Sequence, residues 1–268
     1  MSQEKNFLKV NNLTKYFEGQ YGSKIHILDN VTLLIKKDNE RGSIDSILAP
    51  LGSGKSTLLK IIAGVDNKYD GEIYFEDNDI KNIKPSDIVI VPEKSSSFPW
   101  LNVKDNILFA EKIINIKISD NDIKKIISLV GLTGYENHFP HDSSLGFRFR
   151  ISLARAIACQ PKLILIDDSF KKMKTEIRNE MNLLIKNISK ELNMNFLVAT
   201  TNIKEAILIS NKIFIMEGKP GKIAKEIDLT SEDIMIKDSK INLYESVRNE
   251  IENYFKSKNE LDMINFSI

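Results

Sequence analysis

The fold of this chain is decided by the stretch Ala49-Pro50-Leu51-Gly52-Ser53-Gly54-Lys55-Ser56-Thr57. Its two glycines let backbone N–H groups curl around an anion, its lysine can reach the outer phosphates of a nucleotide, and the Ser56 hydroxyl can ligate Mg²⁺. The stretch therefore predicts a phosphate-binding loop, called the P-loop below. Ala49 stands where the usual pattern G-x-x-x-x-G-K-[ST] begins with glycine. Alanine weakens the match only if the backbone at position 49 needs a positive φ.

The residues on both sides of the P-loop support this interpretation. Residues 43–48 form a short, mainly apolar stretch, and residues 58–65 have helical spacing. A helix that begins at the loop directs unpaired N–H groups and the positive end of its dipole toward the phosphates. The alternative is a chance Gly-Ser turn, which needs neither a strand before it nor a helix after it. We therefore predict that the nucleotide is bound by Gly52, Ser53, Gly54, Lys55, Ser56 and Thr57.

Strands and helices alternate along the rest of the chain. Apolar and β-branched stretches predict further strands at residues 7–10, 25–35, 71–75, 88–91, 163–166, 196–200 and 212–216. Helical spacing predicts helices around residues 123–130, 177–192 and 243–255. The apolar run 163–166, which ends at Asp167 and Asp168, is typical of a strand buried on both faces. The pattern predicts an α/β core with a parallel sheet and a helical insert.

Composition excludes several classes of protein. The 268 residues include 38 Lys+Arg and 37 Asp+Glu, and a formal net charge of +1 does not favour nucleic acid as a partner. The single cysteine excludes an internal disulfide framework and favours a reducing compartment. The first residues lack the apolar core of a signal peptide, and no apolar run is long enough to span a bilayer. Because the three histidines lie in no cluster with ligand spacing, we expect no metal site of that kind.

Several motifs in a fixed order resemble the ATP-binding subunits of ATP-binding cassette (ABC) transporters. The stretch Phe98-Pro99-Trp100-Leu101-Asn102-Val103-Lys104-Asp105-Asn106 is most similar to the importer branch for nitrate, sulfonates and taurine. Residues 139–141 and 151–158 are similar to the same branch. The resemblance covers nearly the whole chain and implies one domain, a P-loop NTPase core with a mainly parallel sheet, an N-terminal antiparallel β portion and a helical subdomain. We expect the core at residues 1–98 and 159–228, the insert at about 99–158 and a C-terminal extension at 229–268.

The resemblance also implies ligands and partners. In this family two chains dimerise head to tail, each ATP lies between the P-loop of one chain and the signature motif of the other, and the dimer drives a membrane-spanning permease. Lys55, Ser56 and Thr57 match the phosphate and Mg²⁺ ligands, and Asp167 matches the acidic residue that holds the Mg²⁺ shell. Phe17 matches the aromatic residue that stacks on adenine, with Tyr16 as its neighbouring alternative and a strand core as the competing role of that position. A solute-binding protein is a further candidate partner, and the chain is expected to be cytoplasmic and peripheral at the inner face of the cell membrane.

The residues expected to carry out hydrolysis depart from the family pattern. Glu93 stands where a glutamine normally senses the γ-phosphate, Asp168 replaces the glutamate that polarises the attacking water, and Thr201 replaces a histidine. A shift of about 1 Å at a reacting centre can lower a rate about 10²-fold, which is comparable with the smaller contributions of a general base. We therefore expect ATP hydrolysis at this site to be slow or conditional.

The signature motif is altered as well. Where the family has Leu-Ser-Gly-Gly-Gln at the start of a helix, this chain has Ser143-Ser144-Leu145-Gly146-Phe147. Ser144 and Gly146 remain candidate ligands for the nucleotide of the partner chain, whereas Leu145 places a branched side chain where backbone approaches phosphate. Lys174 replaces an acidic residue that communicates between the two sites. Either a homodimer or a heterodimer fits, and three hypotheses remain: a weak ATPase of an importer, a subunit that binds nucleotide without hydrolysis, and a P-loop protein unrelated to transport.

The aromatic segment 98–100 has two interpretations. It is either a plain hydrophobic turn or part of the contact with the permease, and exposed aromatic side chains favour the second because they are enriched at interfaces.

Overall fold

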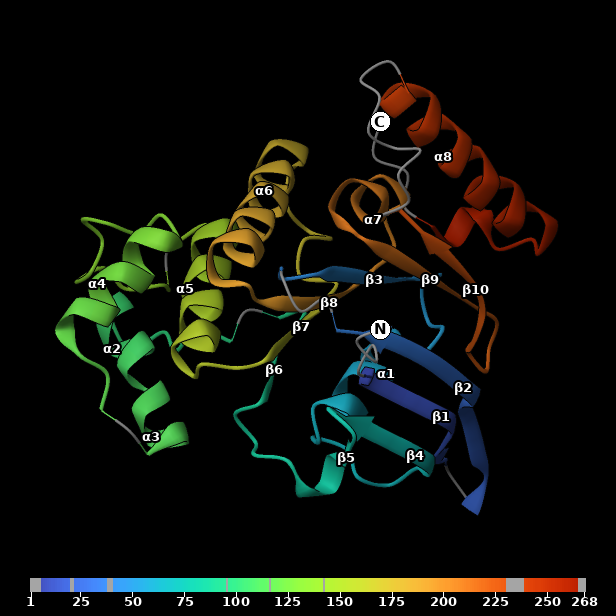
Figure 1. Cartoon of the computed structure of the whole chain (residues 1–268), viewed down its shortest axis with the longest axis horizontal. Coiled ribbons are helices and arrows are strands. Elements are labelled where there is room, and N and C mark those ends of the chain that lie inside the picture. Colours follow the sequence, from blue (N-terminus) through green and yellow to red (C-terminus); the bar gives the residue numbers. More distant parts are fainter. Residues whose placement is uncertain are drawn as a thin grey trace, which may run out of the picture.

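The computed structural model describes residues 6–19, 22–37, 41–94, 96–115, 117–141, 143–229 and 239–264, without the side chains of residues 239–243 and 263 (Figure 1). Its β structure forms two sheets. The smaller sheet is antiparallel, with the order β2-β1-β4-β5. Its strands are β1 (Asn6–Glu18), β2 (Lys24–Lys36), β4 (Asp70–Phe75) and β5 (Asn78–Asp79).

The larger sheet has six strands in the order β10-β9-β3-β8-β7-β6. Its strands are β3 (Ile44–Leu48), β6 (Ile88–Val91), β7 (Leu163–Asp167), β8 (Asn195–Thr200), β9 (Lys212–Glu217) and β10 (Lys222–Asp228). All neighbours pair in parallel except β9 and β10. Every residue of β3 and β7 is buried, as expected of central strands that are covered on both faces. The register places Leu48 opposite Thr200 and Asp167 opposite Ala199, so these strands end at the same edge of the sheet.

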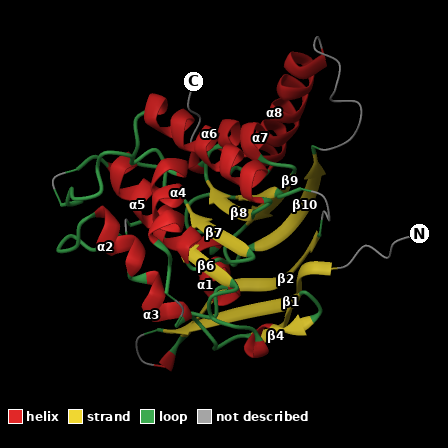
Figure 2. Ribbon diagram, turned by 60° about the vertical axis from the view of Figure 1, so that its left-hand side comes forward, coloured by secondary structure: helices red, strands yellow, loops and turns green. Residues whose placement is uncertain are grey.

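Helices cover both faces of the larger sheet (Figure 2). They are α1 (Lys55–Ile62), α2 (Val103–Leu108), α3 (Ala110–Ile114), α4 (Asp120–Leu129), α5 (Leu145–Ala158), α6 (Thr175–Leu192), α7 (Ile203–Ile209) and α8 (Ser239–Ser257), with two 3₁₀ turns at Ile80–Asn82 and Leu261–Met263. Because side chains alternate along a strand, neighbouring residues of β7 enter different cores. Leu163 and Leu165 pack with α1 and the antiparallel sheet, whereas Ile164 and Ile166 pack with α5 and α6.

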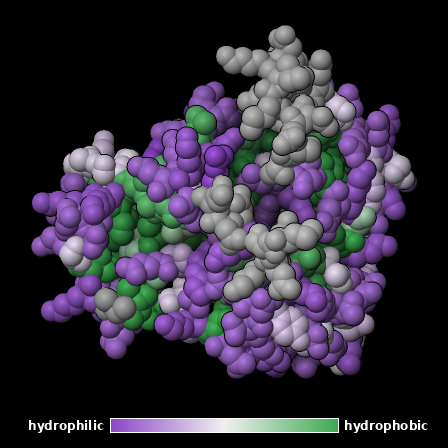
Figure 3. Space-filling model, in the orientation of Figure 1, coloured by the Kyte–Doolittle hydropathy of each residue, from purple (hydrophilic) through white to green (hydrophobic). Residues whose placement is uncertain are grey.

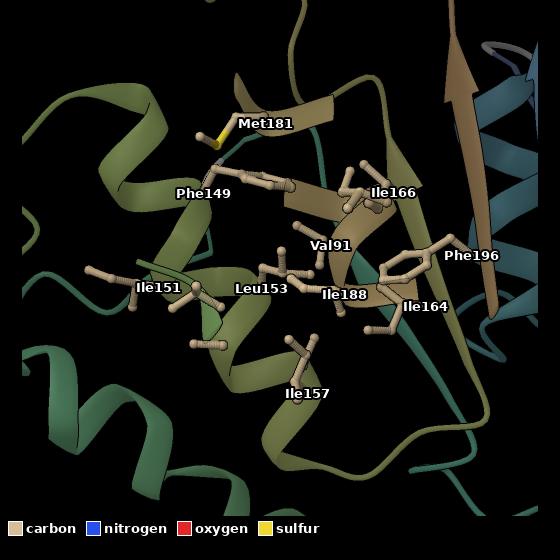
Figure 4. Close-up of a cluster of buried hydrophobic side chains, with 14 of the residues drawn as sticks. Val91, Phe149, Ile151, Leu153, Ile157, Ile164, Ile166, Met181, Ile188 and Phe196 are labelled. Carbon is tan, nitrogen blue, oxygen red and sulfur yellow. The ribbon is translucent and has the colours of Figure 1, made fainter. Parts of the chain in front are cut away.

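The core on the helical side joins the helical subdomain to the sheet. Phe149, Leu153 and Ile157 of α5 lie against the β7 side chains Ile164 and Ile166 (Figure 4). These side chains recur at intervals of four residues along α5, which places them on one face of the helix. This packing fixes the position of α5, and therefore of the signature segment at its beginning, relative to the carboxyl end of β7.

Short polar side chains begin the helices of the subdomain. Asn102 Oδ1 accepts a hydrogen bond from the Asp105 N–H at the start of α2, and Ser119 Oγ accepts one from the Asp122 N–H at the start of α4. Both are typical N-caps, which satisfy backbone donors that have no partner within the helix.

The fold class predicted from the sequence is confirmed, including the antiparallel N-terminal portion and the helical subdomain between β6 and β7. Several details differ from the prediction. The first helix ends at Ile62 and not at residue 65, the first strand extends to Glu18, and β5, α7 and β10 were not predicted. The terminal helix is confirmed as α8, while residues 230–238 and 265–268 of the expected extension lie outside the described residues. In the described ranges, no helix combines the length and the apolar character that crossing a membrane requires.

Candidate functional site

The P-loop connects the carboxyl end of β3 to the N-terminus of α1. Gly52 and Gly54 adopt φ values of +83° and +92°, which glycine accepts readily and a residue with a Cβ does not. A Cβ on Gly54 would also lie 2.7 Å from Leu28 Cδ2. Ala49, in contrast, is not among the described residues with positive φ, so the alanine at this position is free of backbone strain. The departure of Ala49 from the usual pattern is therefore conformationally harmless.

The Lys55 ammonium lies within the P-loop. Its Nζ donates hydrogen bonds to the carbonyl oxygens of Ala49 (3.0 Å) and Pro50 (2.9 Å). Burial lowers the pKa of Lys55 to about 8, and the nearby carboxylates of Asp168 and Asp167 only partly oppose this effect. A phosphate group beside Nζ would favour the charged form, so the residue is arranged to gain from an anionic ligand.

The two predicted Mg²⁺ ligands lie next to each other. Ser56 Oγ at the start of α1 donates a 2.7 Å hydrogen bond to Asp167 Oδ1 at the end of β7. Burial raises the pKa of Asp167, and the hydrogen bond from Ser56 opposes this shift. Hydroxyl and carboxylate oxygens are the hard ligands that Mg²⁺ prefers, and it usually takes only one or two of them from the protein beside phosphate oxygens and water. This pair therefore fits the metal, although no cluster of three or more His, Cys, Asp or Glu side chains occurs among the described residues.

Asp168 follows directly and has an unusual backbone. Its φ is +42°, and its N–H donates to the carbonyl oxygen of Ala199 on β8 (2.9 Å). Aspartate and asparagine tolerate this left-handed region better than most residues, and such conformations occur preferentially at functional sites. Burial raises the pKa of Asp168, while the positive charges of Lys55 and Lys171 lower it. A carboxyl group with a raised pKa is better suited to accept a proton than an ordinary aspartate.

Glu93 and Thr201 lie at the same edge of the sheet, after β6 and β8. The Glu93 carboxylate is 42% exposed and lies 3.6 Å from Lys172 Nζ, so its negative charge is partly neutralised. Thr201 is buried. Thr200 Oγ1, next to it, donates a hydrogen bond to Glu205 Oε2 (3.1 Å). The Thr200 carbonyl oxygen accepts a hydrogen bond from the Ala49 N–H of the P-loop (3.2 Å). The structure thus brings both residues to the edge that carries the P-loop.

The signature segment lies apart from this edge, at the N-terminus of α5. Ser144 caps the helix, because its Oγ accepts a 3.2 Å hydrogen bond from the Phe147 N–H. Gly146 is buried, and a Cβ there would lie 2.9 Å from Ile177 Cγ2 of α6. Leu145 packs against the core on the helical side. Among the residues that the structure describes, no hydrogen bond or ion pair joins Ser144 or Gly146 to the P-loop.

The contacts of β1 distinguish between the two aromatic candidates. Tyr16 stacks on His26 of β2, with ring centroids 4.3 Å apart. Phe17 lies on the other face of β1, where Lys15 Nζ is 4.9 Å from its ring centroid and also binds Asp66 beyond α1 (2.7 Å). That face of β1 covers α1, the helix that begins at the P-loop. This favours Phe17, whose ring is 42% exposed, as the aromatic residue nearer a bound nucleotide.

Sequence reasoning missed two supports of the site. Arg178 at the start of α6 donates from Nη2 to the carbonyl oxygens of Lys171 and Met173 (both 3.3 Å), which fixes the loop after Asp168. The turn between β9 and β10 packs on the P-loop, where a Cβ on Gly221 would lie only 1.9 Å from the Ser53 carbonyl oxygen. The pair Pro220-Gly221 is a signal for a turn. However, no local pattern indicates which other segment a turn contacts.

The sequence model of the family described as "ABC transporter" matches residues 28–171, which include the P-loop, Asp167 and Asp168. The chain belongs to the ABC transporter family. It is an ATP-binding subunit of that family, as its motifs predict.

Individual relatives of this cassette agree with the family assignment. The aliphatic sulfonates import ATP-binding protein SsuB of Bacillus cereus (strain ZK / E33L) is 35% identical over 222 residues, which cover 82% of this chain and 85% of the relative. The spermidine/putrescine import ATP-binding protein PotA of Bacteroides fragilis (strain YCH46) is 34% identical over 239 residues, or 87% of this chain and half of that protein. The predicted similarity to the sulfonate branch is therefore confirmed.

Solved structures confirm the fold of the cassette. The dimeric post-hydrolysis state of the ATP-binding cassette MJ0796, bound to ADP and Pi, superposes with a TM-score of 0.70 at 26% identity and covers 83% of this chain and 99% of that chain. The structure of cbiO1 from Clostridium perfringens gives a TM-score of 0.70 at 23% identity, covering 92% and 100% of the two chains.

Proposed function

We propose that this cassette binds ATP with Mg²⁺ at the P-loop and acts as the nucleotide-binding subunit of an importer for a small solute. The observation that carries the proposal is the arrangement of three side chains at the carboxyl edge of the sheet. The buried Lys55 ammonium lies within the P-loop, and the Ser56 hydroxyl and the Asp167 carboxylate are joined by a hydrogen bond. Mg²⁺, when bound, would supply positive charge beside the phosphate oxygens. The importer part of the proposal is supported by the names of the sulfonate and polyamine relatives.

Hydrolysis at this site is proposed to be slow. Asp168 has one methylene fewer than glutamate, so its carboxylate lies nearer the backbone than the pattern requires, and a misplacement of about 1 Å is worth about 10²-fold in rate. Glu93 adds a negative charge that is only partly neutralised by Lys172 at 3.6 Å. Thr201 donates a hydrogen bond at most and carries no positive charge.

We further propose that the site is completed by a second cassette, either a copy of this chain or a relative. Ser144 and Gly146 would contact the nucleotide of that partner, since they lie in the first turn of α5, where backbone N–H groups lack partners within the helix. The dimeric cassette of MJ0796 supports this arrangement.

The permease is proposed to dock on the helical subdomain, which would hold the chain at the inner face of the membrane. An apolar patch is visible on that side of the molecule, at the left of Figure 3. Trp100 is 70% exposed, although its loop is firmly held: the buried Asn106 side chain accepts from the Phe98 N–H (2.8 Å), and Arg155 lies over the Phe98 ring at 4.4 Å. A rigid, exposed aromatic side chain is typical of an interface anchor.

The test of ATP binding is thermal stabilisation by MgATP together with steady-state phosphate release. We expect ATP to stabilise the wild type, and Lys55→Ala to abolish both the stabilisation and any release. Lys124→Ala is the control, because Lys124 is exposed on α4. If ATP does not stabilise the wild type, or if Lys55→Ala binds it equally well, the proposed function is wrong.

A second candidate is a subunit that binds nucleotide without productive hydrolysis and pairs with an intact ATPase. It is favoured by the position of Leu145, whose side chain begins the helix that should approach the partner's phosphate. Each site of a homodimer is impaired on both halves, whereas each site of a heterodimer is impaired on one half only. We therefore expect faster phosphate release from the heterodimer, and equal rates from the two purified dimers would contradict this expectation.

A further inference from the structure

The turn between β9 and β10 brings a second lysine to the P-loop. A Cβ built on Gly52 would lie 2.9 Å from Cε and 3.0 Å from Nζ of Lys219. The end of the Lys219 side chain therefore lies across the backbone of the loop, and the missing side chain at Gly52 leaves room for it. Gly52 is one of the glycines through which the loop would approach the phosphates.

The backbone of this turn is fixed on two sides. Gly221 donates its N–H to the Ile27 carbonyl oxygen and accepts the Asp29 N–H, both at 2.9 Å, so the turn is joined to β2. The Gly218 N–H donates to Glu260 Oε1 (3.0 Å), which joins the turn to the segment after α8. Because Gly221 also lies close to the Ser53 carbonyl oxygen, the backbone that carries Lys219 has a defined position relative to the P-loop.

The Lys219 ammonium has no acidic partner among the described residues. Its side chain is exposed, and within the described ranges it forms no ion pair. The other lysines near this turn are engaged: Lys222 and Lys258 both pair with Glu217, at 3.5 and 3.2 Å. An ammonium group without an acidic partner, held against a loop of anion-binding N–H groups, is suited to a phosphate oxygen.

We propose that Lys219 is a further nucleotide-binding residue, whose ammonium contacts a phosphate group held by the P-loop. The inference rests on the proposed function, because it needs a nucleotide at this loop. It adds a second cation to Lys55 and assigns to the β9–β10 turn a part in recognising nucleoside polyphosphates. The contact is charge-assisted but open to solvent, so it strengthens binding moderately.

The experiment compares Lys219→Met, Lys219→Arg and Lys222→Met in the full chain. Methionine keeps most of the aliphatic stem and removes the charge, arginine keeps the charge, and Lys222 is a neighbouring lysine that contacts an acid and not the loop. Calorimetric titration with MgATP should show binding about five- to tenfold weaker for Lys219→Met, as expected for one exposed charge-assisted hydrogen bond. Lys219→Arg and Lys222→Met should remain within about twofold of the wild type, and Lys219→Met should lose part of the salt dependence of binding.

Each other outcome overturns the inference in a recognisable way. If the wild type binds ATP and Lys219→Met binds it equally well, Lys219 is not a ligand, although the proposed function stands. Equal weakening by Lys219→Met and Lys219→Arg would assign the effect to packing, and equal weakening by Lys222→Met would assign it to general charge. If the wild type does not bind ATP, both this inference and the proposed function fail. Unfolding midpoints equal to the wild type establish that the variants are folded.

Discussion

The P-loop edge and the signature end of α5 differ in how their polar groups are used. At the P-loop edge, Lys55 donates to the carbonyl oxygens of Ala49 and Pro50, and Ser56 at the start of α1 donates to Asp167 at the end of β7. At the beginning of α5, Ser144 caps its own helix and Gly146 is packed against Ile177. The polar groups of the first region are positioned to bind a ligand, whereas those of the second region stabilise their own helix. The two halves that a composite ATP site would take from this cassette are thus built differently, and only the P-loop half has its polar groups directed at a ligand.

The pairing of Ser56 and Asp167 gives the largest expected effect. We predict that Asp167→Asn lowers the affinity for MgATP about 10- to 100-fold, because it removes an anionic ligand of the metal while leaving Ser56 a hydrogen-bond acceptor. Titration with ATP in Mg²⁺ and again in EDTA measures the effect. The two values should differ strongly for the wild type and little for the variant. An undiminished Mg²⁺ effect in Asp167→Asn would break the assignment of the P-loop edge as the metal-binding half.

The pKa of Lys55 predicts a pH dependence confined to the same edge. Because its pKa is lowered to about 8, the free protein loses the ammonium as pH rises above that value, and ATP binding must then take up a proton. We predict that affinity is nearly constant below pH 7.5 and falls about fivefold between pH 8 and pH 9. Lys55→Arg should bind without this fall, since guanidinium does not titrate there. Calorimetry in two buffers of different ionisation enthalpy measures the proton uptake, and its absence at pH 8.5 would contradict the prediction.

A substitution at the signature end should affect stability but not ATP binding by the isolated chain. In Gly146→Ala the new Cβ would lie 2.9 Å from Ile177 Cγ2, which costs about 1–3 kcal/mol, while the better helix propensity of alanine returns up to about 1 kcal/mol. We predict a net loss of about 1 kcal/mol in the free energy of unfolding, measured by urea denaturation. The affinity of the monomer for ATP should stay within about twofold.

A second substitution sharpens this prediction. Ile177→Ala removes Cγ2, the methyl group that the new Cβ at residue 146 would meet. The double variant should therefore lose less stability than the sum of the two single variants. Strictly additive losses of stability would show that contact with Ile177 does not destabilise Gly146→Ala.

The smallest effect is expected at Trp100. The side chain is 70% exposed, so Trp100→Ser should change the free energy of unfolding by less than about 0.5 kcal/mol and leave ATP affinity unchanged. Co-purification with the permease should decrease, because an exposed aromatic anchor would be lost. A variant that binds the permease as well as the wild type would remove Trp100 from the proposed docking surface.

The sequence predicted the site where its residues follow strand ends. The family resemblance assigned Asp167, Asp168 and Thr201 to one site, and the structure places them at the carboxyl ends of the neighbouring parallel strands β7 and β8. The contact of Gly221 with Ser53 could not be predicted, because the two residues are distant in sequence and no local pattern around either one indicates the other as its neighbour. The short α7 and the edge strand β10 were missed for a related reason. Their residues are stabilised mainly by long-range packing on β3, β9 and α8.

The backbone of Asp168 bears on the hydrolysis that we propose to be slow. At a φ of +42°, aspartate has a lower torsional energy than a longer side chain such as glutamate. Asp168 therefore suits the backbone at this position, although its carboxylate reaches less far than that of glutamate. A glutamate at position 168 would extend the carboxylate further but would raise the torsional energy of the backbone at the same residue. If hydrolysis is slow as proposed, Asp168→Glu alone would therefore restore only part of the rate, because the backbone at this position disfavours the longer side chain.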